Sequence, residues 1–579
     1  MSKPHGSVLA HASQWPLQPF LPGSNNEHWS IVMKTMHGAI ILLSLLITFA
    51  TAQAQSTESY RDLLTARVRS GKVPAPAHLQ AYVQEGKLAL CLRDAILLTL
   101  ENNSNIAIEE TQIESQKFNL LGAHQPFDPT LQSSLNINRY SNPSYSQLQG
   151  VGASTSTAVN TLSQAGQLTY AQTFATGTSI QASLSSNRSS TNSSYNFFNP
   201  YYSSTMNLQF TQPLLRNAGR FANTAQLVIA RRSLAQSRSS FEAEVNDAIL
   251  QVVNLYWNAV QARGALDVQQ KSLKLAEVSY QSDKRALELG ALPPLDIYRS
   301  ESEVASRKVQ VIQASYSLTQ AEDALRRTIG ADQEPQYRLL ELNLTEQPQP
   351  QGELESISIE DALAQALSQR PEFDVVKNAL ANDQTNIQLA HNRLRPDLSM
   401  TGFYQSSGLG GNQYDLFTGK LLSPGGFGSS MSQTFGFGYP GYGGTLTLNL
   451  LLRNRGAQAQ LGSALVSRTH DLYNAQGMKE QITQEVSEAV HQLEEAKMAL
   501  EAGSVSFELA QKSLAADQRK FELGAETNFF VLDSQTKLAA AELTLLQTQV
   551  NYQLARAAVG HATSRLLEPF HVKIAELSK

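Results

Sequence analysis

The heptapeptide Arg285-Ala-Leu-Glu-Leu-Gly290-Ala291 has a close relative 234 residues further along the chain, Arg519-Lys-Phe-Glu-Leu-Gly524-Ala525. Each one ends a long stretch of helical periodicity, and glycine is the residue that most readily takes the left-handed conformation that closes a helix. A second helical stretch follows each glycine. The chain is therefore expected to contain two helical hairpins of the same design.

Other short segments repeat in the same order, which is typical of a chain built from two related halves. The further matches are Asp94-Ala95 with Asp361-Ala362, Pro129-Thr-Leu131 with Pro396-Asp-Leu398, and Leu215-Arg216-Asn217-Ala-Gly219 with Leu452-Arg453-Asn454-Arg-Gly456. Each half reads as helix, strands, long helix, turn and helix.

The two stretches that end at the repeated glycines are too long for an ordinary globular helix. Apolar residues recur at spacings of three, four and seven from Arg220 to Leu289, which predicts a coiled-coil seam. Its 70 residues would extend about 105 Å, and the 68 residues from Gly456 to Leu523 about 102 Å. Four shorter helices are predicted to stack end to end against them: Leu88 to Ala123, Pro294 to Ile329, Ile359 to Leu394 and Asn528 to Thr563.

Between the helices lie segments in which apolar residues alternate with Ser, Thr, Asn and Gln, and this period of two predicts strands. The apolar members are Leu131, Leu135, Ile137, Leu168, Tyr170, Phe174, Ile180, Ala182, Leu184, Met206, Leu208, Phe210, Leu446, Leu448, Leu450 and Leu452, and more loosely Leu398, Met400, Gly402 and Tyr404. One apolar face, one neutral polar face and aromatic residues near the strand ends are typical of an outer-membrane barrel. A soluble β-sandwich is the alternative.

The charged residues are unevenly distributed, and the strand regions have almost none. Charged residues make up 16% of the chain, but Arg188 alone is charged from Tyr140 to Leu215. The net charge of −5 gives no basic field that could hold nucleic acid. The single cysteine, Cys91, excludes an intramolecular disulfide and reads as a core residue.

The N-terminal region has the three parts of a secretory signal. A basic start at Lys34 precedes an apolar run from Ala39 to Phe49 and a small-x-small site that predicts cleavage after Ala54. The apolar run of 11 residues is shorter than the roughly 20 that a membrane anchor, the alternative, requires. Since residues 1–32 precede the usual start of a signal, translation is expected to begin at Met33 or Met36.

Taken together, the order and duplication of these motifs resemble the TolC family of outer-membrane efflux proteins. The resemblance covers the chain from about Leu88 to Leu566. Its most specific marks are the doubled Leu-Gly turn followed by Leu-Asp, the doubled Asp-Ala opening, Arg370-Pro371-Glu372, Arg395-Pro396-Asp397-Leu398 and Gln212-Pro213-Leu214-Leu215.

The resemblance implies a membrane α+β fold, in which a trimeric outer-membrane β-barrel continues into a long periplasmic coiled-coil barrel. One chain offers four to six strands, whereas membrane barrels need about eight, and open sheet edges cannot lie in hydrocarbon. The family has four strands per chain and twelve per barrel. The extra alternating runs around Phe174 to Ile180 form either a hairpin outside the barrel or additional staves.

The domain boundaries follow from the repeat and the resemblance. They are residues 1–54 for the signal peptide region, 55–87 for an N-terminal periplasmic segment, 88–330 for repeat 1, 331–357 for an equatorial linker, 358–566 for repeat 2 and 567–579 for a C-terminal tail.

The implied function is passive conduction by the outer-membrane duct of a tripartite efflux or type I secretion system. The implied partners are two further copies of the chain, a periplasmic adaptor (membrane fusion protein), an inner-membrane pump and outer-membrane lipid. A secreted periplasmic coiled-coil scaffold is the alternative. An enzyme is a distant third hypothesis, because the chain has no catalytic constellation.

By the resemblance, the hairpin tips form the periplasmic mouth where the adaptor docks, and the matching positions are Leu289, Gly290, Ala291, Leu523, Gly524 and Ala525. In the family, acidic residues just beyond the tips line the closing aperture. The resemblance therefore implies this role for Asp296 and Asp533. Phe530 stands where some members carry a second aspartate. The structural alternatives are ordinary glycine helix ends and solvated carboxylates favoured by the helix dipole.

No cofactor or metal is expected. Gly436-Phe-Gly438-Tyr-Pro-Gly441 matches a dinucleotide fingerprint only formally, because it contains Pro440 and opens no helix, so it reads as a surface loop. The histidines show no paired ligand spacing, and His391 and His491 stand alone on helices. Trp257 beside Tyr256 reads as packing. The segments Ser141 to Ala165 and Gln405 to Gly444 read as long flexible loops.

Overall fold

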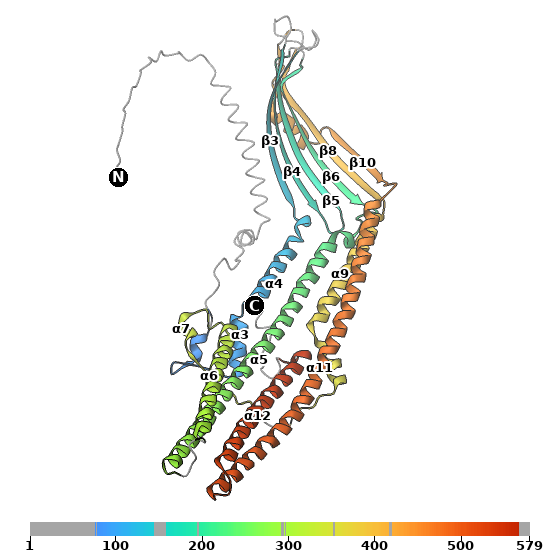
Figure 1. Ribbon diagram of the computed structural model, residues 1–579. Helices are drawn as coiled ribbons and strands as arrows, with labels where there is room; N and C mark the ends of the chain where they lie inside the picture. The colour runs from blue at the N-terminus through green and yellow to red at the C-terminus, as the bar shows by residue number, and fades with distance from the viewer. Residues whose placement is uncertain are drawn as a thin grey trace, which may run out of the picture.

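A computed structural model describes most of the chain. The described residues are 76, 78–143, 158–193, 196–290, 295, 297–350, 354–415, 418 and 420–566. The predicted signal region, the tail 567–579 and the two site residues Ala291 and Asp296 lie outside them. The molecule is elongated: one sheet occupies one end, and long helices run from it to two hairpin tips at the other (Figure 1).

Six long antiparallel strands form the main sheet in the order β10-β8-β6-β5-β4-β3, and the short β9 pairs with β8. The strands are β3 Thr130–Pro143, β4 Ala158–Thr173, β5 Ser179–Thr191, β6 Phe198–Pro213, β8 Asp397–Tyr414, β9 Leu421–Ser423 and β10 Pro440–Asn449. The alternating runs whose place the sequence left open are β4 and β5, which lie inside this sheet. Much of the predicted loop Ser141 to Ala165 is strand as well, because β4 already begins at Ala158.

The strand register gives the sheet two chemically different faces and confirms the predicted alternation, except that Phe174, Leu450 and Leu452 lie just beyond the ends of β4 and β10. Leu208 of β6 lies opposite Ala182 of β5 and Tyr404 of β8, and its chain neighbour Asn207 lies opposite Ser183 and Gln405. The face that carries Leu208 is called the apolar face below, and the face that carries Asn207 the polar face. Many side chains of the apolar face are exposed in one chain, among them Leu131, Leu135, Ile137, Leu208, Phe210, Met400, Leu446 and Leu448.

A helix that the sequence did not predict lies on the apolar face. Within the predicted loop Gln405 to Gly444, the structure instead extends β8 to Tyr414, forms α10 (Phe427–Phe435) and starts β10 at Pro440. A Cβ atom at Gly408 or Gly410 would collide with the backbone of this segment, so the two glycines allow α10 to lie directly on β8. Thr434 Oγ1 donates to the carbonyl of Ser204, and Ser406 Oγ to the carbonyl of Thr434, at 3.1 and 2.7 Å.

The two long helices are close to their predicted lengths. Helix α5 spans Arg220–Glu288 and α11 spans Arg455–Glu522. Helix α5 buries Val245, Ile249, Val252 and Tyr256 completely, at the spacings of three and four that predicted the seam. Helices α6 (Ile297–Thr328) and α12 (Asn528–Ala562) return from the tips and pack on α5 and α11.

The predicted helix Ile359 to Leu394 is two helices, α8 (Ile359–Gln369) and α9 (Pro371–Leu394). Arg370 lies between them with φ −69° and ψ 125°. Proline excludes the helical conformation for the residue before it and provides no N–H for the helix ladder, so Pro371 separates the two helices. Helix α9 then packs against both α5 and α11.

The predicted helix Leu88 to Ala123 is likewise interrupted. It consists of strand β2 (Lys87–Leu90), α3 (Leu92–Asn102) and α4 (Ser104–Gly122). Asn103 separates the helices, and its side chain accepts a hydrogen bond of 2.8 Å from the N–H of Asn105, which starts α4. Cys91, predicted to be core, is half-buried at the start of α3, where its Sγ donates to Asp94 at 3.0 Å.

A small sheet of three strands, in the order β1-β2-β7, joins the N-terminal segment to the middle of the chain. Strand β2 pairs in parallel with β7, so that Leu88 lies opposite Leu342, and both side chains are fully buried. Trp257 packs here edge-on against Tyr256, as predicted. The outer strands of the small sheet are β1 Val83–Gln84 and β7 Glu341–Leu344, preceded in the chain by a 3-10 turn Leu79–Tyr82 and by α7 Pro335–Arg338, respectively. A second 3-10 turn, Gln125–Phe127, lies between α4 and β3 and contacts β4 of the main sheet.

A cluster of charged side chains joins the two repeats through their helices. The guanidinium of Arg370 donates to Glu485 of α11 at 2.7 Å and to Glu372 at 2.8 Å. His561 of α12 lies 3.2 Å from Glu485 and 2.6 Å from Asp247 of α5. Since Arg370 and His561 are buried, we call these five residues the buried ion cluster.

Candidate functional site

The two hairpin tips have the same backbone geometry. Gly290 has φ +73° and donates its N–H to Leu287 at 3.0 Å, and Gly524 has φ +72° and donates to Phe521 at 2.9 Å. A Cβ atom at either glycine would meet no atom within 4 Å. Glycine is therefore required at both positions by the backbone conformation and not by a lack of room for a side chain.

An exposed leucine precedes each of these glycines. The fractional exposure of Leu289 is 84% and that of Leu523 is 75%. The two repeats thus present a large apolar side chain to solvent at corresponding positions. The tips bring together Leu289 and Gly290 in one hairpin, and Leu523, Gly524 and Ala525 in the other.

Each hairpin also has a carboxylate that bonds a serine across its two helices, a feature that the sequence analysis missed. Asp517 accepts a 2.5 Å hydrogen bond from Ser534, and Asp283 accepts one from Ser300. Both pairs are 17 residues apart, and they lie 234 residues from each other, like the two glycines. The alignment of the two repeats could therefore have found them.

The same aspartate of the first hairpin also holds the second hairpin. Asn528, the first residue of α12, donates its Nδ2 to both carboxylate oxygens of Asp283 at 2.8 Å. Further from the tips, Arg307 of α6 donates to Thr536 of α12 at 2.6 Å. Asp283 and Arg307 are buried, so these bonds fix the spacing of the hairpins near their tips.

Two of the predicted aperture residues, Phe530 and Asp533, lie in the first turns of α12. Asp533 is half-buried and forms an ion pair of 2.7 Å with Lys537, and this hydrogen bond raises the pKa of the lysine. Phe530 is exposed and packs edge-on against Phe529, with ring centroids 5.4 Å apart. In one chain, Asp533 and Phe530 therefore share a surface near the second tip.

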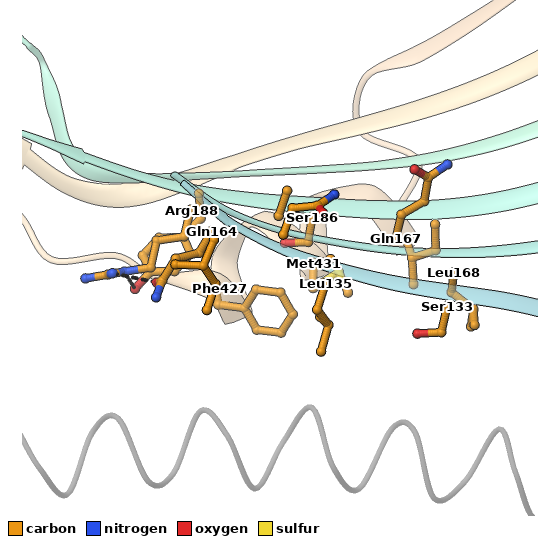
Figure 2. A pocket seen from close by; sticks show the side chains of 15 residues that line it. Ser133, Leu135, Gln164, Gln167, Leu168, Ser186, Arg188, Phe427 and Met431 are labelled. Atoms are coloured by element: carbon orange, nitrogen blue, oxygen red, sulfur yellow. Dashed lines mark hydrogen bonds between the residues drawn. The ribbon is translucent and has the colours of Figure 1, made fainter. Parts of the chain in front are cut away.

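The apolar face of the sheet contains a cavity of about 360 Å³ between α10 and strands β3 to β5 (Figure 2). Leu135, Leu168, Phe427 and Met431 line it. The guanidinium of Arg188 lies at one end and is engaged by Gln164 at 2.8 Å and by Tyr202 at 3.1 Å (Figure 2). The cavity presents apolar surface and has no catalytic arrangement.

The described part of the chain has neither a metal-binding cluster nor a membrane-spanning helix. No group of three or more His, Cys, Asp or Glu side chains is placed there to hold a metal ion. Among the helices described, none combines the length and the apolar character needed to cross a membrane. His391 and His491 are exposed.

Long paired helical hairpins, joined to a sheet with one apolar and one polar face, define an α+β protein of the outer-membrane channel type. The sequence matches the outer membrane efflux protein family over residues 175–331 and 362–564, and the chain belongs to that family. The protein is therefore an efflux protein located in the outer membrane. Membership of this family does not favour the alternative function, a secreted periplasmic scaffold.

Individual relatives agree with this assignment. The chain is 21% identical to the outer membrane efflux protein BepC of Brucella suis over 364 residues, which cover 62% of this chain and 72% of BepC. Its fold is similar to that of the CmeC outer membrane channel of Campylobacter jejuni, with 14% identity, a TM-score of 0.59 and coverage of 88% and 94% of the two chains. A membrane protein from Pseudomonas aeruginosa matches with 15% identity, a TM-score of 0.57 and coverage of 85% and 99%.

Proposed function

We propose that three copies of the chain form one passive duct. The three sheets close a single barrel in the outer membrane, and the helices continue it into the periplasm. A periplasmic adaptor and an inner-membrane pump deliver solutes to the hairpin tips, and the duct itself performs no chemistry. Residues 88–330 and 358–566 are its two repeats, joined by the linker 331–357.

The observation that carries this proposal is the open sheet. Among the described strands, β3 pairs only with β4, and β10 pairs only with β8, so both edges of the sheet lack a partner in one chain. Unpaired backbone groups cannot lie in hydrocarbon, because each costs several kcal/mol there. Strands β3 and β10 run in opposite directions, so β3 of one copy can pair in antiparallel fashion with β10 of the next.

The first prediction concerns assembly. The protein purified in detergent is expected to be a trimer that contains both helix and strand, because only the joined sheets leave no open edge. Light scattering coupled to size exclusion measures the mass, and gel electrophoresis should show a smaller species only after heating. A folded monomer that stays soluble without detergent would refute the duct.

The second prediction concerns the aperture, which we propose is lined by Asp533 and Phe530. Three copies of Asp533 around one axis would attract cations, and three phenyl rings at nearly the same depth would form a hydrophobic constriction. Asp533→Asn should weaken block by multivalent cations, whereas Phe530→Ala should raise the resting conductance and keep the block. Single-channel recording in planar bilayers measures both quantities.

The ion pair with Lys537 provides the control for that experiment. Lys537→Gln frees the carboxylate of Asp533, so cation block should become stronger than in the parent protein. If none of the three variants differs from the parent, the constriction lies elsewhere. We propose that Asp296, at the other tip, faces the same aperture.

A further inference from the structure

The main sheet has two strands more than the four that the family resemblance implies, and these two are full members of it. Strand β4 pairs with β3 from Thr130↔Ala171 to Pro143↔Ala158, and β5 pairs with β6 from Ser179↔Thr211 to Ser189↔Tyr201. No register shift interrupts either ladder or the one between β4 and β5. Strands β4 and β5 therefore separate β3 from β6.

The turn between β4 and β5 is fixed to the start of the long helix α5. The N–H of Gly219 donates to the carbonyl of Thr176 at 3.2 Å, and Thr178 Oγ1 donates to Gln212 at 2.5 Å. Gly177 has φ +84°, and a Cβ atom there would lie 2.6 Å from the carbonyl oxygen of Asn217. The hairpin is thus seated on the junction of sheet and helices, as a barrel strand turn must be.

The added strands also continue the two faces of the sheet. Leu168 and Tyr170 of β4 and Ile180 and Leu184 of β5 lie on the apolar face. On the polar face the positions of β4 and β5 between Thr161 and Thr191 are Ser, Thr, Gln, Asn and Ala. On the apolar face the residues nearer the β4–β5 turn are mostly apolar, and Gln164, Ser186 and Arg188 follow beyond them. A hairpin lying outside a barrel in water would have no need for the apolar patch near the turn.

We infer that the assembled barrel has eighteen strands, six from each chain, and that its pore is wider than that of a twelve-stranded barrel. The inference rests on the proposed trimer. With strands about 4.8 Å apart and tilted by about 40°, eighteen strands enclose a backbone diameter of about 36 Å, whereas twelve enclose about 24 Å.

The ring of helices below the sheet has about the same diameter as the eighteen-stranded barrel. Helices α4, α5, α9 and α11 form the part of each chain next to the sheet (Figure 1), so three chains supply twelve helices there. At an interaxial distance of about 9 to 10 Å, twelve helices form a ring about 35 to 38 Å across. Eighteen strands join such a ring with little taper.

The lining of this pore determines what it admits. Asp397, at the start of β8, is the only charged residue on the polar face of the six described strands. Helix α10 lies on the opposite, apolar face and does not occupy the polar side. The barrel therefore suits large hydrophilic solutes, selected by size in the helical part rather than by charge in the barrel.

The test is a cysteine scan of β5 in a Cys91→Ser background, in trimers reconstituted into lipid vesicles. Single cysteines at Gln181 and Ser183 should react with a membrane-impermeant thiol reagent, and those at Ala182 and Leu184 should be protected by lipid. Gln209 and Leu208 of β6 are the matched controls, because β6 is a barrel strand in either arrangement. Uniform labelling along β5 in an assembled trimer would overturn the inference.

Electron cryomicroscopy of the same trimers gives a second measurement that does not depend on labelling. The expected result is a barrel ring about 36 Å in backbone diameter, and a ring of about 24 Å would overturn the inference. Absence of a trimer would instead refute the proposed function, so the two failures are distinguishable.

Discussion

Valine in place of Gly290 or Gly524 is expected to abolish export while trimers still reach the outer membrane. Both glycines have positive φ, and a β-branched residue in that conformation costs about 1–2 kcal/mol or more. A cost of this size is small for an assembly with helices of 69 and 68 residues, so folding should survive. The tip turn, however, should change direction and displace the exposed leucine beside it.

The measurement is the accumulation of a panel of dyes and toxic compounds in cells that depend on this protein, together with recovery of periplasmic proteins crosslinked to it. Gly86→Val is the matched control, because Gly86 has φ +79° with no atom within 4 Å of a Cβ but lies in the β1–β2 turn, away from both tips. Export should persist in that variant. Normal export from both tip variants would leave Gly290 and Gly524 as ordinary helix ends.

Much of this architecture could be predicted because it depends on local periodicity. Apolar residues recur every three or four positions in α5 and every second position in β6, and these periods indicate which side chains share a face. The doubled Leu-Gly turn predicted both tips, and the two long predicted helices differ from the structure by one residue at one end of α5 and by one residue at each end of α11. Prediction failed at Pro371, where the periodicity continued through a residue that ends a helix.

The missing parts depend on contacts between distant residues. Asp283 and Asn528 are 245 residues apart, and Asp247 and His561 are 314 apart. Each of these side chains looks like an ordinary surface residue in sequence. Helix α10 escaped prediction because its buried stripe consists of Ser430 and Thr434, which are polar and pack on the glycines of β8. Arg370-Pro371-Glu372 was noted only as a family mark, although Arg370 belongs to the buried ion cluster.

The pH dependence of stability should follow from two members of the buried ion cluster. Burial disfavours the charged form of His561, but its hydrogen bonds to Asp247 and Glu485 outweigh burial and raise its pKa to about 9. The hydrogen bond from His561 lowers the pKa of Glu485 to about 2, against burial and with help from Arg370. The contribution of His561 to the free energy of unfolding is complete below about pH 6.5 and is lost as the pH rises through about 9. The contribution of Glu485 is complete above about pH 4.5 and is lost as the pH falls through about 2.

Replacing Glu485 by glutamine should therefore produce the largest loss of stability among single changes in the helical part. It leaves Arg370 and His561 with charges that are buried and short of a partner, and removal of one partner from a buried pair typically costs about 3–5 kcal/mol. Thermal unfolding of the trimer at pH 6, followed by circular dichroism, should shift to markedly lower temperature.

Glu488→Gln is the matched control, because Glu488 is one turn away on α11, exposed, and bonded only at 3.3 Å to Gln492. The decline in stability at alkaline pH should begin at lower pH in Glu485→Gln, since His561 then keeps only Asp247 as its anionic partner. Equal unfolding temperatures for the two variants would show that the cluster does not hold the repeats together.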